Sequence, residues 1–220
     1  MFDRWLRWGA PGALLAVALL HPLPDANDIA RSIGSSLLRW QAVHVAQLLL
    51  FPLVALAAYR LLPLATGMER SIARVGFAVF AVAGAAFDAM IGLGTGTLVA
   101  IAGSDPARIS LVQDYWWHRY SEPVVGIVYL STALGWLVGI AATAVAVRKA
   151  GTSLFAVGLL AVSALLAVDH TFPFGPAAMV ALLAATAVIG AERRKAALPA
   201  SEGDMSAEEP TRSRTWGPGT

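Results

Sequence analysis

Two ionisable side chains lie well inside apolar stretches of this 220-residue chain. His44 lies in the apolar stretch 38–62, and Asp88 lies in the apolar stretch 72–102. An ionisable group in a lipid-spanning segment is costly unless it faces protein or water, so each is a candidate functional residue. Imidazole is the commonest metal ligand, and carboxylates complete zinc and copper sites. The pair therefore indicates a metal site or a site of proton exchange.

The depths of these two side chains can be compared if both stretches are helices that cross a bilayer in opposite directions. His44 lies six residues beyond Leu38, which corresponds to about 9 Å of helix. Asp88 lies fourteen residues beyond Arg74, about 21 Å along its helix, which again leaves about 9 Å of a ~30 Å core. We therefore predict that the two side chains share a level and approach within about 6 Å, where opposite charges still interact.

Two further histidines precede proline-rich turns. His21 follows the first apolar stretch, and Asp169 and His170 lie between the last two. Prolines end helices and stiffen turns, so we expect these three side chains to form the rim of a polar pocket. The candidate residues for a ligand or metal pocket are His44, Asp88, Gln47, His21, His170 and Asp169. In the alternative, Asp169 and His170 only cap a helix end and meet water.

The spacing of glycines provides an alternative interpretation of Asp88. Gly84, Asp88, Gly92 and Gly96 recur every four residues, so they share one face of a helix. Small residues allow a neighbouring helix to approach closely in a membrane. In this alternative the stripe is a packing seam, and the carboxyl group only hydrogen-bonds across it.

The stretch 103–122, "GSDPARISLVQDYWWHRYSE", is predicted to be the longest loop between apolar segments. Its tyrosines and tryptophans suit an interfacial belt, where amphipathic rings lie at the depth of the lipid headgroups. In the alternative this loop is a lid over the pocket. The candidate lid residues are Trp117, His118 and Glu122.

The composition predicts the elements that must position these residues. Hydrophobic residues make up 57% of the chain and charged residues only 14%, whereas soluble domains carry about 25% charged residues. We predict an all-α fold, a polytopic integral membrane bundle of six transmembrane helices within residues 1–195. The six segments are 8–23, 38–62, 72–102, 123–147, 152–169 and 174–191. Cysteine is absent, which excludes thiolate zinc sites and iron–sulfur clusters in this chain.

The lysines and arginines predict the orientation of the bundle. With both termini in the cytoplasm, twelve of the sixteen basic residues lie on the inner side and four on the outer side, in line with the positive-inside rule. All four histidines then lie toward the outer side of the cell membrane. A cleaved signal peptide is the alternative for the first segment, but a small-residue cleavage site is missing, so we expect that helix to be retained.

Together these features predict an outward-facing polar pocket that binds a metal ion or a small hydrophobic ligand. Zinc and copper are the candidate metals, and haem is less favoured because only His44 is deep. A proton-coupled transporter and a non-catalytic subunit that docks a partner on the outer rim are the alternatives, and an enzymatic role stays undecided. The predicted partners are the lipid bilayer and the pocket ligand, without nucleic acid, since no basic aromatic patch is present. The excess of arginine over lysine favours a bacterial origin.

The end of the chain, residues 196–220, is rich in Pro, Gly, Ser and Glu, and we predict a disordered cytoplasmic tail. Deleting residues 200–220 should leave folding and membrane insertion intact, because nothing in this stretch can pack in a bilayer. Membrane fractionation followed by size-exclusion chromatography checks this expectation. Loss of the folded protein from the membrane fraction would show that the tail is structural.

Overall fold

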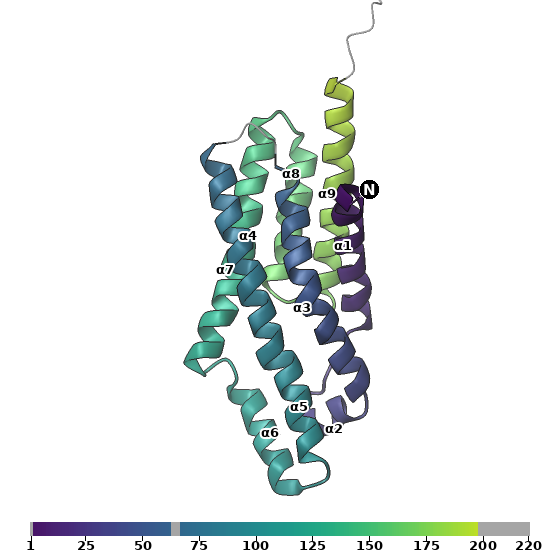
Figure 1. Cartoon of the computed structure of the whole chain (residues 1–220), viewed down its shortest axis with the longest axis vertical. Helices are drawn as coiled ribbons and strands as arrows, with labels where there is room; N and C mark the ends of the chain where they lie inside the picture. The colour runs from purple at the N-terminus through teal and green to yellow at the C-terminus, as the bar shows by residue number, and fades with distance from the viewer. Residues whose placement is uncertain (1, 63–66, 198–220) are drawn as a thin grey trace, which may run out of the picture.

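The computed structural model describes residues 2–62 and 67–197, and every regular element within these ranges is a helix. The predicted all-α class is therefore confirmed. Figure 1 shows one elongated bundle, with the start of the chain and the last helix at the same end. The elements are α1 (Phe2–Leu20), α2 (Ile29–Gly34), α3 (Leu37–Tyr59), α4 (Met68–Phe87), the π-helical turn η1 (Asp88–Leu93), α5 (Gly94–Ala102), α6 (Pro106–His118), α7 (Pro123–Lys149), α8 (Leu154–Ser163), the 3₁₀ turn η2 (Ala164–Ala167) and α9 (Phe174–Ala197).

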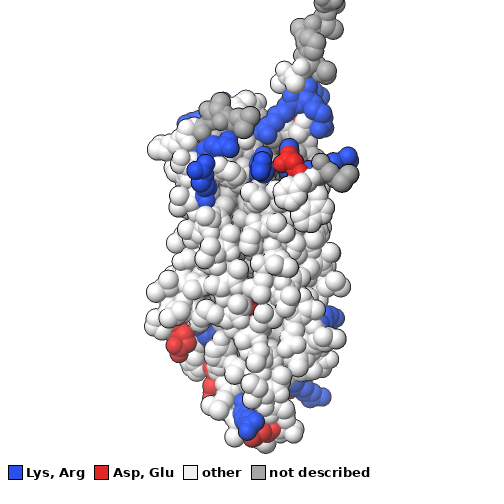
Figure 2. Space-filling view, in the orientation of Figure 1, with Lys and Arg blue, Asp and Glu red and all other residues white. Residues whose placement is uncertain are grey.

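Four of these helices are long and apolar enough to cross a membrane. They are Leu37–Tyr59, Met68–Ala102, Pro123–Lys149 and Phe174–Ala197. Figure 2 shows that the visible charged side chains gather at the two ends and leave a nearly uncharged band between them. These features indicate a membrane protein. The helices α1 and α8 occupy the other two predicted apolar segments, but they do not meet the same criteria of length and apolarity.

The helix α8 is short, and this places the turn that follows it inside the bundle. The 10 residues of α8 and the four of η2 span roughly 20–25 Å, less than the ~30 Å of a bilayer core. Figure 1 shows the chain turning back there at about mid-height, before α9 begins. The turn 168–173 therefore lies beside the middle of its neighbours rather than at the end of the bundle.

The prediction of a long loop at 103–122 was wrong, because most of that stretch forms α6. The carboxylate of Asp105 accepts hydrogen bonds from the backbone amides of Ala107 and Arg108, and Pro106 occupies the first helical position. An acidic N-cap followed by proline is a strong helix start. The same kind of cap, at Asp28, begins the short helix α2 within the polar stretch that follows α1.

Several helices extend beyond the apolar segments that predicted them. The helix α1 begins at Phe2 rather than at residue 8, and α9 continues to Ala197 rather than ending at residue 191. Arginine has good helix propensity and can keep its charged end in water, so a helix need not end where its apolar run ends. The predicted tail lies outside the described residues from residue 198 onward.

Three glycines allow α4 and α7 to pack backbone against backbone. A Cβ atom added at Gly76 would lie 2.6 Å from the backbone nitrogen of Gly139, and one at Gly135 would lie 2.6 Å from the nitrogen of Phe80. The buried ring of Trp136 packs beside this contact and donates from its indole nitrogen to the backbone oxygen of Ser163 on α8, at 2.9 Å. The half of the bundle nearer to the chain ends is therefore tightly packed and apolar.

The Gly135→Ala substitution should destabilise the bundle by about 1–3 kcal/mol, because the new methyl group would press on the backbone of α4. Thermal unfolding of the purified protein in detergent measures this loss. The matched control is Gly12→Ala, since a Cβ atom at Gly12 meets nothing within 4 Å. Equal unfolding temperatures for the two variants would contradict the packing described here.

Candidate metal centre

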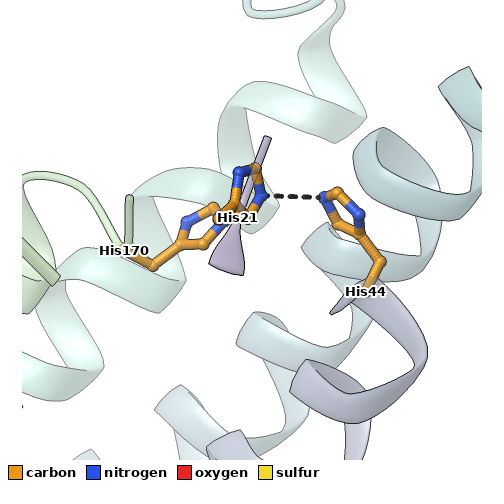
Figure 3. A group of neighbouring side chains, drawn as sticks. All are labelled: His21, His44 and His170. Carbon is orange, nitrogen blue, oxygen red and sulfur yellow. Dashed lines mark hydrogen bonds between the residues drawn. The ribbon is translucent and has the colours of Figure 1, made fainter. Parts of the chain in front are cut away.

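Three buried or partly buried histidines from distant parts of the chain meet in one cluster. His21 follows the end of α1, His44 lies on α3, and His170 lies in the turn after η2. One nitrogen from each imidazole lies within 4.8 Å of the others. Figure 3 shows the three rings directed toward one another, with His21 between the other two. We call this group the histidine triad.

Backbone hydrogen bonds determine which nitrogen two of the imidazoles present to the cluster. Nδ1 of His21 lies 2.7 Å from the carbonyl oxygen of Pro22, and Nδ1 of His44 lies 2.7 Å from the carbonyl oxygen of Trp40. A carbonyl oxygen can only accept, so each Nδ1 carries the hydrogen and donates it. In a neutral imidazole the lone pair is then on Nε2, the arrangement found in metal-binding histidines whose other nitrogen is held by a carbonyl group.

The two Nε2 atoms thus oriented lie only 3.4 Å apart. Two lone pairs at this distance repel each other, and a cation between the two nitrogens or an extra proton on one ring relieves that repulsion. Two nitrogen ligands of a tetrahedral zinc ion, each at about 2.0–2.1 Å from the metal, lie roughly 3.3–3.4 Å apart. The distance between the Nε2 atoms of His21 and His44 therefore matches that between two ligands of one zinc ion.

The third histidine also offers a free nitrogen. Nδ1 of His170 lies 3.7 Å from a carboxylate oxygen of Asp169, and its Nε2 is buried without a hydrogen-bond partner. Burial lowers the pKa of His21 to about 4, and burial also lowers the pKa of His170. Because of these lowered pKa values both imidazoles are neutral near pH 7, which is the form that binds metals.

The predicted proximity of His44 and Asp88 is confirmed. Nε2 of His44 lies 3.9 Å from Oδ1 of Asp88, and only 1% of Asp88 is exposed. The other carboxylate oxygen is buried and has no hydrogen-bond partner. Asp88 begins the π-helical turn η1, and such turns occur frequently at functional sites because they rotate side chains out of the regular helical position.

Two glycines make room for the histidines. A Cβ atom at Gly92 would lie 1.9 Å from Cδ2 of His44, and a Cβ atom at Gly175 would lie 1.9 Å from the backbone oxygen of His170. The glycine stripe is a site of close packing, as the alternative interpretation predicted. At Gly92 and Gly96, however, the groups packed against it are the rings of His44 and Trp40. The packing seam and the polar site are therefore the same feature, because Gly92 has no side chain and so leaves space for the imidazole of His44.

A cavity of about 240 Å³ opens beside the triad. Its lining includes all three histidines together with Asp88, Asp169 and Arg119. The guanidinium carbon of Arg119 lies 3.7 Å from the ring centre of Trp116 and 4.4 Å from that of Tyr120. Among the described residues no carboxylate lies within ion-pair distance of Arg119, so its charge is balanced only by aromatic faces and backbone.

The other predicted site residues have different places. Gln47 is fully buried one turn from His44, neither of its amide atoms has a hydrogen-bond partner, and it does not line the cavity. The predicted lid residues Trp117, His118 and Glu122 do not line the cavity either. Trp116 near the end of α6, and Arg119 and Tyr120 directly after that helix, line the cavity in their place.

The sequence prediction missed three residues that border the site. Trp40 lies one turn before His44, contacts its ring at 4.3 Å between centres, and donates from its indole nitrogen to the backbone oxygen of Gly92 at 2.6 Å. Trp116 and Arg119 line the cavity from the side of α6. Helical spacing, four residues in the first case and three in the second, is the signal that could have identified them.

Comparisons of the chain with protein-family models, with curated proteins and with solved structures found no match. A fold by itself does not determine function, and here no relative provides an analogy. The function must therefore be argued from the chemistry and geometry of the site.

The contact between His44 and Asp88 predicts that substitutions at the two positions are not additive. Each of His44→Ala and Asp88→Asn removes the same interaction, so the double variant should lose less stability than the sum of the single losses, by about 0.5–3 kcal/mol. Unfolding of the three variants and the unchanged protein in detergent measures this difference. Additive losses would show that the two side chains do not interact.

Proposed function

We propose that this chain is a polytopic membrane protein that binds a divalent transition-metal ion, zinc first, in a pocket open to the outer side of the cell membrane. The observation that carries the proposal is the convergence of the three histidine nitrogens. The backbone hydrogen bonds of His21 and His44 support it, because they hold the Nδ1 atom of each ring and leave both Nε2 lone pairs available to a metal. Such preorganisation lowers the cost of binding.

The ligand set favours zinc over the other metals considered. Three imidazoles with a fourth position left open are characteristic of catalytic zinc, and the neighbouring carboxylate of Asp88 can orient a ligand or complete the site. Copper remains the second candidate, since imidazole also suits copper. Haem does not fit, because the cavity is smaller than the ~300–1,000 Å³ of ordinary cofactor pockets and the triad nitrogens are too close to admit a macrocycle.

The open side of the metal site would face the cavity, and the cavity lining favours a small anionic ligand there. The lining carries two carboxylates, Asp88 and Asp169, and one guanidinium, Arg119. A divalent ion would leave this set with one excess positive charge, which a monoanion neutralises. A metal ion in such a position supplies Lewis acidity and lowers the pKa of bound water, so hydrolysis is the reaction class that the site could support.

We propose six membrane-embedded helical segments, with α1 and the α8–η2 segment added to the four long helices; α8–η2 enters the bilayer without reaching its far surface. The basic residues at the end that holds both the start of α1 and the end of α9 support a cytoplasmic location for that end. The plasma membrane remains the proposed location. The first helix must be retained in the mature protein for this function, because it is followed directly by His21.

Proton exchange is the second candidate function, and the His44–Asp88 pair is the observation that favours it. A protonated His44 could donate to His21 and pair with the carboxylate of Asp88. Against transport through the membrane, the described residues beyond this pair include the packed rings of Phe51, Phe80 and Trp136, which leave an apolar region without a polar route. Such a pair would exchange protons with the outer cavity only.

Metal analysis of the purified protein tests the proposed function. We expect about one zinc or copper ion per chain after metal loading and removal of weakly bound ions. His21→Ala, His44→Ala and His170→Ala should each weaken zinc binding by more than about 100-fold, since even an outer-shell partner contributes 10–100-fold. His118→Ala is the matched control, because that imidazole is exposed and outside the triad.

Two results would overturn the metal proposal. One is an unchanged protein that retains neither zinc nor copper at micromolar concentrations. The other is a loss of binding in His118→Ala that equals the loss in the triad variants. A metal-free protein in which His44→Ala abolishes pH-dependent changes in the fluorescence of Trp40 would support the proton-exchange function instead.

A further inference from the structure

A second polar site lies at the end of the bundle where α1 begins, away from the histidine triad. A groove of about 850 Å³ runs between the start of α1 and the end of α9. Arg4, Arg7 and Trp8 line it from α1, and Thr186 and Arg194 line it from α9. Figure 2 shows that blue arginine and lysine side chains greatly outnumber red acidic ones at this end. We call this site the arginine groove.

The arginine groove has more positive charge than its own acidic residue can balance. Asp3 is its single lining carboxylate among the described residues; it pairs with Arg7 and lies 3.8 Å from Arg60. Arg4 and Arg194 make no ion pair or hydrogen bond with any residue in the described ranges. Nε of Arg7 is enclosed and has no acceptor. The groove therefore contains three guanidinium groups and one carboxylate, which leaves donors and positive charge for an anion.

The surroundings of the groove place it at the level of lipid headgroups. Trp5 and Trp8 on the same turns of α1 are 49% and 43% exposed, and Phe2 is exposed beside them. Exposed tryptophans at the end of an apolar helix are characteristic of the membrane interface, where the ring lies among the headgroups. The first anions that these arginines meet are therefore phosphate groups of lipids.

We propose that the arginine groove binds the phosphate group of an anionic phospholipid, with phosphatidylglycerol as the model ligand. Guanidinium groups present paired donors that match phosphate oxygens, and arginines from two helices can hold one phosphate from two sides. Basic pockets between transmembrane helices at the cytoplasmic side bind acidic lipid headgroups in this way. The site is independent of the proposed metal centre.

The positive-inside rule alone does not require this arrangement. That rule concerns the number of basic residues near the ends of spans, and other arginines at the same end, such as Arg74 and Arg148, satisfy it equally. Arg74 donates to the hydroxyl group of Tyr59 and Arg148 donates to the backbone oxygen of Thr152, so both already have partners. The groove differs because the guanidinium groups of Arg4 on α1 and Arg194 on α9 are unpaired among the described residues and line one open groove.

A bound lipid would join α1 to α9 and so stabilise the position of α1 in the bundle. The first helix packs against α3 and α9, and its far end leads to His21. An anionic lipid that binds the folded bundle more tightly than the unfolded chain raises the unfolding temperature by mass action. The lipid effect should therefore be visible both as binding and as stability.

The test uses the full-length protein in a neutral detergent, titrated with phosphatidylglycerol or phosphatidylcholine and followed by native mass spectrometry and thermal unfolding. We expect preferential binding of phosphatidylglycerol. The double variant R4Q/R194Q should bind it about 30-fold more weakly, as the loss of two headgroup arginines predicts. The control R74Q/R148Q loses the same charge at the same end outside the groove and should keep most of its affinity.

The remaining arms separate the possible outcomes. Inorganic phosphate at millimolar concentration should not displace the lipid, and displacement would make a free phosphate ion the ligand and overturn the lipid proposal. Equal binding of the two lipids, or equal losses in the two double variants, would also overturn it. The single variants R4Q and R194Q serve as replacements if the double variant does not fold, and each should show an intermediate loss that the single control R74Q does not.

Discussion

The close approach of α3 to the π-helical turn η1 holds the proposed site together. Gly92 has no side chain, so the ring of His44 can lie against its backbone, where any Cβ atom would overlap the ring. The backbone oxygen of Gly92 accepts from the indole of Trp40, and the backbone oxygen of Trp40 accepts from His44. Because both bonds lie in a buried, low-dielectric region, they hold the imidazole in one orientation and one tautomer.

The triad depends on three parts of the chain that arrive at one depth by different means. His44 lies within the regular helix α3, and His21 directly follows the end of α1. His170 lies beside the middle of the bundle because α8 is short. Gly175 allows the last of these approaches, since a side chain at that position would meet the backbone of His170. A longer α8 would move His170 toward the outer end and separate it from the other two nitrogens.

The helix α1 links the two proposed sites. One end lies at the arginine groove and the other end leads to His21, so displacement of this helix would affect both. Between them the described core is apolar and aromatic, so the two proposed sites are separated by packed side chains.

Composition and spacing were sufficient for the helical class, for the positions of the long apolar helices and for the partnership of His44 with Asp88. Those properties follow from local chemistry: an apolar run of sufficient length must be helical in lipid, and the rise per residue places two polar groups at the same depth. Residue types also identified His21 and His170 as candidates, but the sequence placed them at the rim of the pocket rather than beside His44.

The assembly of the triad could not be read from the chain in the same way. It required the turn after α8 to lie beside the middle of the bundle, and α8 packs against α7 and α9 and ends at Ser163, before its apolar run ends. The sequence also could not predict which tryptophan lines the cavity, because Trp116 and Trp117 are equally aromatic. The course of α6 places Trp116 at the cavity and leaves Trp117 exposed. Local patterns specify which residues can act, whereas long-range packing specifies which of them meet.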